Sequence, residues 1–163
     1  QFVTPLHGFC HLTLPSNKTC VVLTLGNNKT QIEGLKEYFD TIPYIVYSDS
    51  SFNDGYCVEI KDKHKDLLAS TPNDKIFELP VHSLQFSYNT LFSLVNALTE
   101  DYRLVLAPCG PKPFTLLNLL VSLNLRYQVD VWRISQGKNS EPVEREANGT
   151  ISILKLERDF IEE

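Results

Sequence analysis

The sequence lacks several features that mark common protein classes. It contains no methionine in 163 residues, and its start at Gln1 has neither the basic segment nor the apolar core of a signal peptide. No stretch approaches the about 18 consecutive apolar residues that a membrane-spanning helix needs. We therefore expect a single domain, residues 1–163, cut from a longer protein, located in the cytoplasm and without a membrane partner.

An excess of basic residues is also missing. The formal net charge is −5, whereas sequence-independent binding to long nucleic acids needs a positively charged surface. The charge therefore argues against long nucleic acid as a partner. It is compatible with a small anionic ligand held in a locally positive pocket.

The cysteines and histidines show no metal-site spacing. The cysteines are Cys10, Cys20, Cys57 and Cys109. No Cys-x-x-Cys pair occurs, which argues against a zinc ribbon or a thioredoxin-like site, and we expect free thiols of a cytoplasmic protein. His7, His11 and His64 lie in separate segments, so we expect no metal and no other cofactor. Glycosylation triplets begin at residues 17, 28 and 148, but such triplets often arise by chance.

Apolar runs alternate with helical patterns along most of the chain. The expected strands are residues 19–25, 44–47, 75–79, 103–107 and 129–134. The expected helices are residues 32–42, 61–69, 86–98 and 114–125. Four strand-to-helix repeats favour a Rossmann-like α/β fold, in which a mostly parallel central sheet is flanked by helices on both faces.

Three local assignments accompany this fold. Residues 56–60 fit either a short strand or the opening of a helix. Asn28 or Thr30 is expected to cap the helix at 32–42. Residues 150–156 alternate between apolar and polar side chains, and we expect them to return as a C-terminal antiparallel hairpin strand at a sheet edge.

Ligands of open parallel sheets bind beyond the carboxyl ends of the strands, near a switch in strand order. This rule selects the residues that directly follow four of the expected strands. They are Gly26, Asn27, Asn28, Ser48, Asp49, His82, Cys109, Gly110 and Lys112.

The loop at residues 108–112 is the most informative of these. Gly110 lets the backbone approach a ligand, and the following helix is expected to present free backbone N–H groups. Lys112 adds a positive charge, while Pro111 and Pro113 stiffen the loop. The combination suits a phosphate, although the loop matches neither a Walker A nor a Gly-x-Gly-x-x-Gly motif. The alternative is a tight strand-to-helix turn with a solvated lysine.

Other candidates have ordinary structural explanations beside the functional ones. Asp49 caps the next element or takes part in chemistry, and His82 is a polar residue or a general base. Cys109 lies near a helix N-terminus, which would lower the pKa of its thiol. A small buried thiol is the interpretation we favour, because no His or Asp is placed nearby in the sequence to form a dyad.

Two loops resemble those of the CRISPR-associated Rossmann-fold (CARF) family of sensor domains. The resemblance rests on residues 21–28, an apolar strand ending in a glycine loop, and on residues 109–114, which are similar to the family's Gly-Gly-Thr-Lys-Pro-like turn. Cys109 and Pro111 depart from that turn. The resemblance implies a homodimer that binds a cyclic oligoadenylate or related nucleotide in antiviral defence, with Lys112 and Gly110 contacting the ligand and residues 26–28 lining the same crevice.

Three functions follow from these observations. The first is a non-catalytic regulatory domain that senses a nucleotide or another phosphorylated effector. The second is an enzyme acting on such a molecule, with Asp49, His82 or Cys109 supplying the chemistry. The third is an interaction domain whose crevice holds no ligand.

Overall fold

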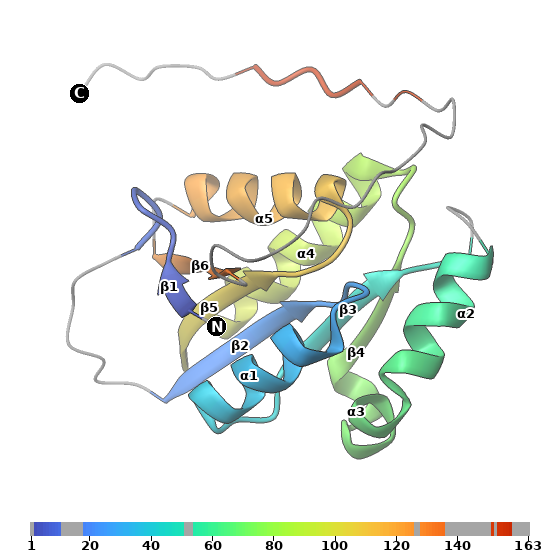
Figure 1. The fold of residues 1–163 in the computed structure, drawn as a ribbon. Helices are drawn as coiled ribbons and strands as arrows, with labels where there is room; N and C mark the ends of the chain where they lie inside the picture. Colours follow the sequence, from blue (N-terminus) through green and yellow to red (C-terminus); the bar gives the residue numbers. More distant parts are fainter. Residues whose placement is uncertain are drawn as a thin grey trace.

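The computed structural model describes residues 2–10, 18–50, 54–125, 128–135, 151 and 153–157. Its six-stranded sheet lies between two layers of helices (Figure 1). The strands are β1 (Phe2–Pro5), β2 (Thr19–Thr24), β3 (Tyr44–Ser48), β4 (Ile76–Leu79), β5 (Arg103–Pro108) and β6 (Val129–Ser135). The helices are α1 (Lys29–Phe39), α2 (Asp54–Lys63), α3 (Lys65–Ser70), α4 (Leu84–Leu98) and α5 (Lys112–Asn124). The predicted Rossmann-like α/β fold is confirmed.

The strand order is β1-β6-β5-β2-β3-β4. All neighbouring strands are parallel except β1 and β6, which pair antiparallel from Phe2 opposite Ser135 to Pro5 opposite Trp132. The antiparallel strand therefore comes from the N-terminal end of the chain. The expected C-terminal hairpin strand is wrong for the described part of that segment, since residues 151 and 153–157 are in no strand. The reason is physical: β1 already occupies the edge of β6 to which a returning strand would bind.

Side chains of the central strand alternate between two apolar layers. Cys20 and Val22 of β2 pack with buried residues of α4 and α5, whereas Val21 and Leu23 pack with those of α1 and α2. This alternation follows from the two-residue period of a strand that is buried on both faces. No helix in the described ranges is long and apolar enough to cross a membrane.

Residues 56–60, which the sequence left open, are helical and belong to α2. Cys57 and Ile60 are three residues apart and are both buried against the sheet, with exposed fractions of 2% and 1%. A spacing of three places both side chains on one face of a helix, whereas it would place them on opposite faces of a strand. The chain then turns at His64 into α3.

Candidate functional site

The strand order reverses between β2 and β5. β3 and β4 lie beyond β2 on one side, and β6 lies beyond β5 on the other. From the carboxyl end of β2 the chain enters α1, and from that of β5 it enters α5, which covers the opposite face (Figure 1). Such switch points are where open α/β sheets bind ligands. The two candidate loops that begin at Gly26 and Cys109 are therefore neighbours.

Two glycines allow these loops to touch. A Cβ atom on Gly26 would lie 1.7 Å from the Cys109 carbonyl oxygen, and one on Gly110 would lie 2.7 Å from the Leu25 carbonyl oxygen. The Cys109 N–H also donates to the Thr24 carbonyl at 3.0 Å, which extends the pairing of the strands. A ligand at this edge must therefore lie on top of the joined loops, because no side chain fits between them.

The start of α5 offers fewer hydrogen-bond donors than the sequence led us to expect. Pro113 has no N–H, and the Phe114 N–H donates to the Pro111 carbonyl at 2.9 Å. Among the hydrogen bonds of the described residues, the N–H groups of Gly110 and Lys112 have no acceptor. The Lys112 side chain is exposed at this helix end. Recognition of an anion would thus depend on two backbone N–H groups and one ammonium group.

The start of α1 lies on the other side of the switch point. The Asn28 side chain accepts a hydrogen bond from the Gln31 N–H at 3.2 Å, so Asn28 is the cap and the first of the two predicted alternatives is confirmed. Asn27, one residue earlier, is exposed. The positive ends of the dipoles of α1 and α5 therefore both lie at the carboxyl edge of the sheet.

The remaining predicted residues lie further along the same edge. Ser48 is buried, its hydroxyl donates to the Asp49 carbonyl at 3.1 Å, and the Asp49 N–H donates to the Leu79 carbonyl at 3.0 Å. His82 follows β4 and is exposed. β4 is three strands from β5, roughly 14 Å at the usual strand spacing. Gly26, Cys109 and Gly110 are thus brought into contact, whereas His82 is not close to them.

The Cys109 thiol is poorly suited to nucleophilic chemistry. Burial raises the pKa of Cys109 to about 12 from its ordinary value of 9.0. Desolvation of the thiolate is the cause of this raised pKa. By exposed area Cys109 is half-buried, and its raised pKa favours an unreactive packed thiol over the nucleophile.

Alkylation at pH 8 tests this environment. The raised pKa lowers the thiolate fraction of Cys109 about 1,000-fold, so we expect iodoacetamide to modify it at least that much more slowly in the folded protein than in urea. Mass spectrometry of timed samples gives the rate at each cysteine. Equal rates at Cys109 in the folded and unfolded chain would contradict the raised pKa of this thiol.

His64 contributes to the site, although the sequence gave no reason to place it there. Its side chain is 2% exposed, and its Nε2 lies 2.8 Å from the Gly26 carbonyl oxygen, so this nitrogen carries the hydrogen and donates. The bond joins residues 38 positions apart. Gly26 is therefore held on one side by His64 and contacts Cys109 on the other. A lone histidine between two mixed-charge helices carries no sequence signal for such a role.

Asn118 is the second residue that sequence reasoning missed. It is fully buried, and its Nδ2 donates to the Phe114 carbonyl at 2.7 Å and to Thr24 Oγ1 at 3.3 Å. Its Oδ1 has no partner among the described residues. A signal did exist, because Asn118 and Ser122 are four residues apart in the leucine-rich α5 and so mark one polar stripe facing the sheet.

Comparisons with known proteins add no identity. No family model matches the chain, and no curated protein matches it. Within the described ranges, no group of three or more His, Cys, Asp or Glu side chains could hold a metal ion. Three cavities in the described part of the chain are lined by residues other than the nine predicted ones.

Proposed function

We propose that the chain is a ligand-sensing domain that binds the phosphate of a nucleotide or another phosphorylated effector on top of the joined loops between β2 and β5. The observation that carries the proposal is the position of Gly26 and Gly110 in contact at the point where the strand order reverses. This point is the preferred ligand position in sheets of this kind. Lys112, two residues after Gly110, has an exposed side chain.

Local charge supports an anionic ligand in a chain whose net charge is −5. The positive dipole ends of α1 and α5, the free N–H groups of Gly110 and Lys112 and the Lys112 ammonium group all belong to this edge. Prolines at 111 and 113 remove two further donors, so the side chain of Lys112 supplies a large share of the attraction. The CARF resemblance makes cyclic oligoadenylates, bound across a homodimer, the first ligands to examine.

A sensor fits better than an enzyme. The candidate catalytic groups Asp49, His82 and Cys109 follow three different strands, and the Cys109 thiol has a raised pKa. The interaction-domain alternative is an outcome of the binding experiment below.

The proposal predicts ligand-dependent stability that depends on Lys112. Thermal unfolding with cyclic and linear adenylates, other nucleotides and inorganic phosphate should reveal one stabilising class, worth about 2.7 kcal/mol at one hundred times its dissociation constant. Lys112→Ala should raise that constant roughly tenfold, because a charge-assisted contact is lost. Lys18→Ala, which changes an exposed lysine directly before β2 at the opposite edge, is the matched control.

Each result of this experiment is decisive. Equal affinity of the Lys112→Ala variant and the parent would show that the loop is not the site. Turnover of a bound nucleotide would favour the enzyme. Stability that no nucleotide or phosphate changes would favour the interaction domain.

A further inference from the structure

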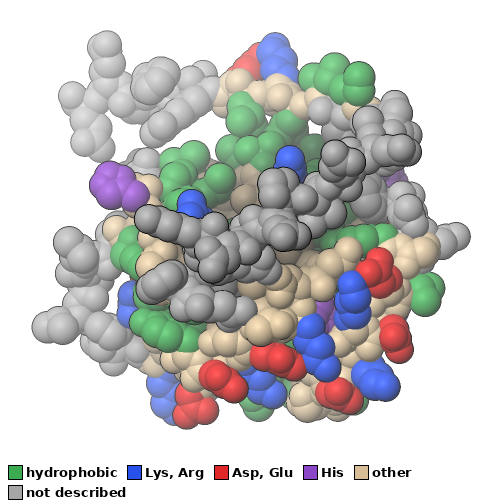
Figure 2. Space-filling model, viewed as in Figure 1, with side chains coloured by type: hydrophobic (Ala, Val, Ile, Leu, Met, Phe, Trp, Pro, Cys, Tyr) green, Lys and Arg blue, Asp and Glu red, His purple; other side chains and the backbone are tan. Residues whose placement is uncertain are grey.

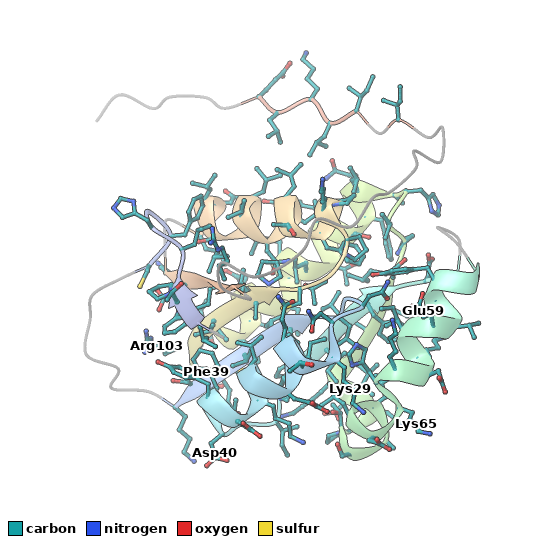
Figure 3. All side chains as sticks on the ribbon, in the orientation of Figure 1. Lys29, Phe39, Asp40, Glu59, Lys65 and Arg103 are labelled. Atoms are coloured by element: carbon teal, nitrogen blue, oxygen red, sulfur yellow. The ribbon has the colours of Figure 1, made fainter. Side chains whose placement is uncertain are left out.

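The helix layer formed by α4 and α5 carries almost no charge. Lys112, the first residue of α5, is the single charged residue in these two helices. On the other side of the sheet, each of α1, α2 and α3 contains charged residues of both signs. Figure 2 shows such side chains gathered in the lower half of the view, and the labelled Lys29, Glu59 and Lys65 of Figure 3 belong to these three helices. The two helix layers therefore present different surfaces.

Leucine side chains form the outward side of α5. Phe114, Leu117 and Val121 are buried against the sheet. The helix has a second set of leucines at spacings of three and four residues, all at least partly exposed: Leu116, Leu119, Leu120 and Leu123. A surface helix normally places polar side chains there, whereas an apolar stripe with this spacing is the pattern by which one helix packs against another.

α4 extends this surface with uncharged side chains. Phe86 is 57% exposed, and Asn89, Ser93 and Asn96 follow it along the exposed side of the helix. Amide and hydroxyl groups both donate and accept hydrogen bonds, so they can pair with copies of themselves. The outward surfaces of α4 and α5, which we call the neutral face, thus combine apolar groups with self-complementary polar ones.

The neutral face is large enough for a weak interface. Two helices of 15 and 13 residues measure about 20 Å in length and, side by side, about 20 Å in width. Two such faces together bury roughly 800 Å² before the relief of the side chains is counted, near the lower end of specific interfaces. A contact of this size corresponds to a dimer in the micromolar range rather than a permanent one.

We propose that the neutral face binds the neutral face of a second copy of this chain, with the leucines of α5 at the centre of the contact. A two-fold interface brings the same patch of both copies together, so a charged residue near the axis would meet a like charge. A partner of different sequence would not impose this restriction. Because the chain has a net charge of −5, two copies approach with least repulsion through their neutral faces. The inference does not rest on the ligand-binding proposal.

Sedimentation equilibrium of the complete chain, without ligand, tests the inference. Over about 1 µM to 1 mM, the mass should rise from 18.6 kDa towards twice that value. Leu116→Glu should raise the dissociation constant roughly tenfold or more, because each copy brings a carboxylate into the contact. Leu116 is 37% exposed and glutamate is a good helix former, so the fold should be retained, which circular dichroism checks. Phe86→Glu, in the first turn of α4, is a second variant with the same expectation.

Val58→Glu is the matched control. Val58 is an apolar residue of α2, is 66% exposed and lies on the other side of the sheet. The substitution adds the same charge as Leu116→Glu and so the same general repulsion between copies. This variant should dimerise like the parent.

Three outcomes would overturn the inference. The first is a chain that stays monomeric over the whole range, and the second is an equal dissociation constant for Leu116→Glu and Val58→Glu, which would place the contact elsewhere. The third is a monomer that dimerises only after Ile153→Ser, which would assign the neutral face to the exposed segment 153–157 of the same chain. None of them alters the dependence of nucleotide binding on Lys112, which decides the proposed function separately.

Discussion

Replacing Gly26 with alanine is expected to destabilise the domain by about 3 kcal/mol or more. The new Cβ would lie 1.7 Å from the Cys109 carbonyl oxygen and 3.3 Å from the Gly110 Cα. All of these neighbours are backbone atoms of β5 and its loop, so no rotation of a side chain can relieve the overlap. The loops must separate, which also strains the hydrogen bond from Cys109 N–H to the Thr24 carbonyl.

Urea denaturation measures this cost as a change in the free energy of unfolding. Gly110→Ala should be second in severity, since its Cβ would lie 2.7 Å from the Leu25 carbonyl oxygen and from Thr24 Cγ2. Gly8→Ala is the control, because Gly8 has a positive φ of 85° but nothing within 4 Å of a Cβ. Its cost should be about 1 kcal/mol, from backbone strain alone.

The order of these three variants decides the interpretation. If Gly26→Ala were no less stable than Gly8→Ala, the loops between β2 and β5 would not be in contact, and the proposed ligand surface on top of them would lose its basis. If the order is as expected, the junction is a rigid platform. A rigid platform suits a sensor, because little conformational freedom is lost when a ligand binds.

Local signals predicted much of the fold. The apolar run at 19–25 and the polar Asn28 that follows it predicted β2, its turn and the cap of α1, since strand period and capping depend on neighbouring residues. The same reasoning predicted β5, whereas it placed the start of the next helix at residue 114, two residues after the observed start of α5 at Lys112. Knowledge of strand order was not needed to select the loops, because all parallel strands end at one edge.

Contacts between distant residues could not be predicted in this way. The bond between His64 and Gly26 spans 38 residues, and that between Asn118 and Thr24 spans 94. Both depend on the side of the sheet to which a helix packs. The same limit explains why the expected hairpin strand is wrong at residues 151 and 153–156, because an alternating pattern indicates a half-buried strand without indicating which edge is vacant. The short β1, with Pro5 at its end, gave no comparable pattern.

Arg103→Met is expected to destabilise the domain by about 3–5 kcal/mol, the usual cost of breaking a buried ion pair from one side. Arg103 Nη2 lies 2.7 Å from Asp130 Oδ2, and the side chains are 27% and 5% exposed. Removal of the guanidinium leaves a buried carboxylate without its cation. The nearby Cys10 thiol cannot replace that charge, and its own pKa is raised by burial and by the negative charge of Asp130.

Asp130→Asn should cost less than Arg103→Met, because the partly exposed guanidinium can still reach water while the amide carries no charge. The double variant, Arg103→Met with Asp130→Asn, should be more stable than Arg103→Met alone, because the buried negative charge that lost its arginine is also removed. Urea denaturation of all four proteins completes the cycle. If the double variant were less stable than Arg103→Met, packing around the arginine side chain, and not the buried Asp130 carboxylate, would determine the cost of the Arg103→Met substitution.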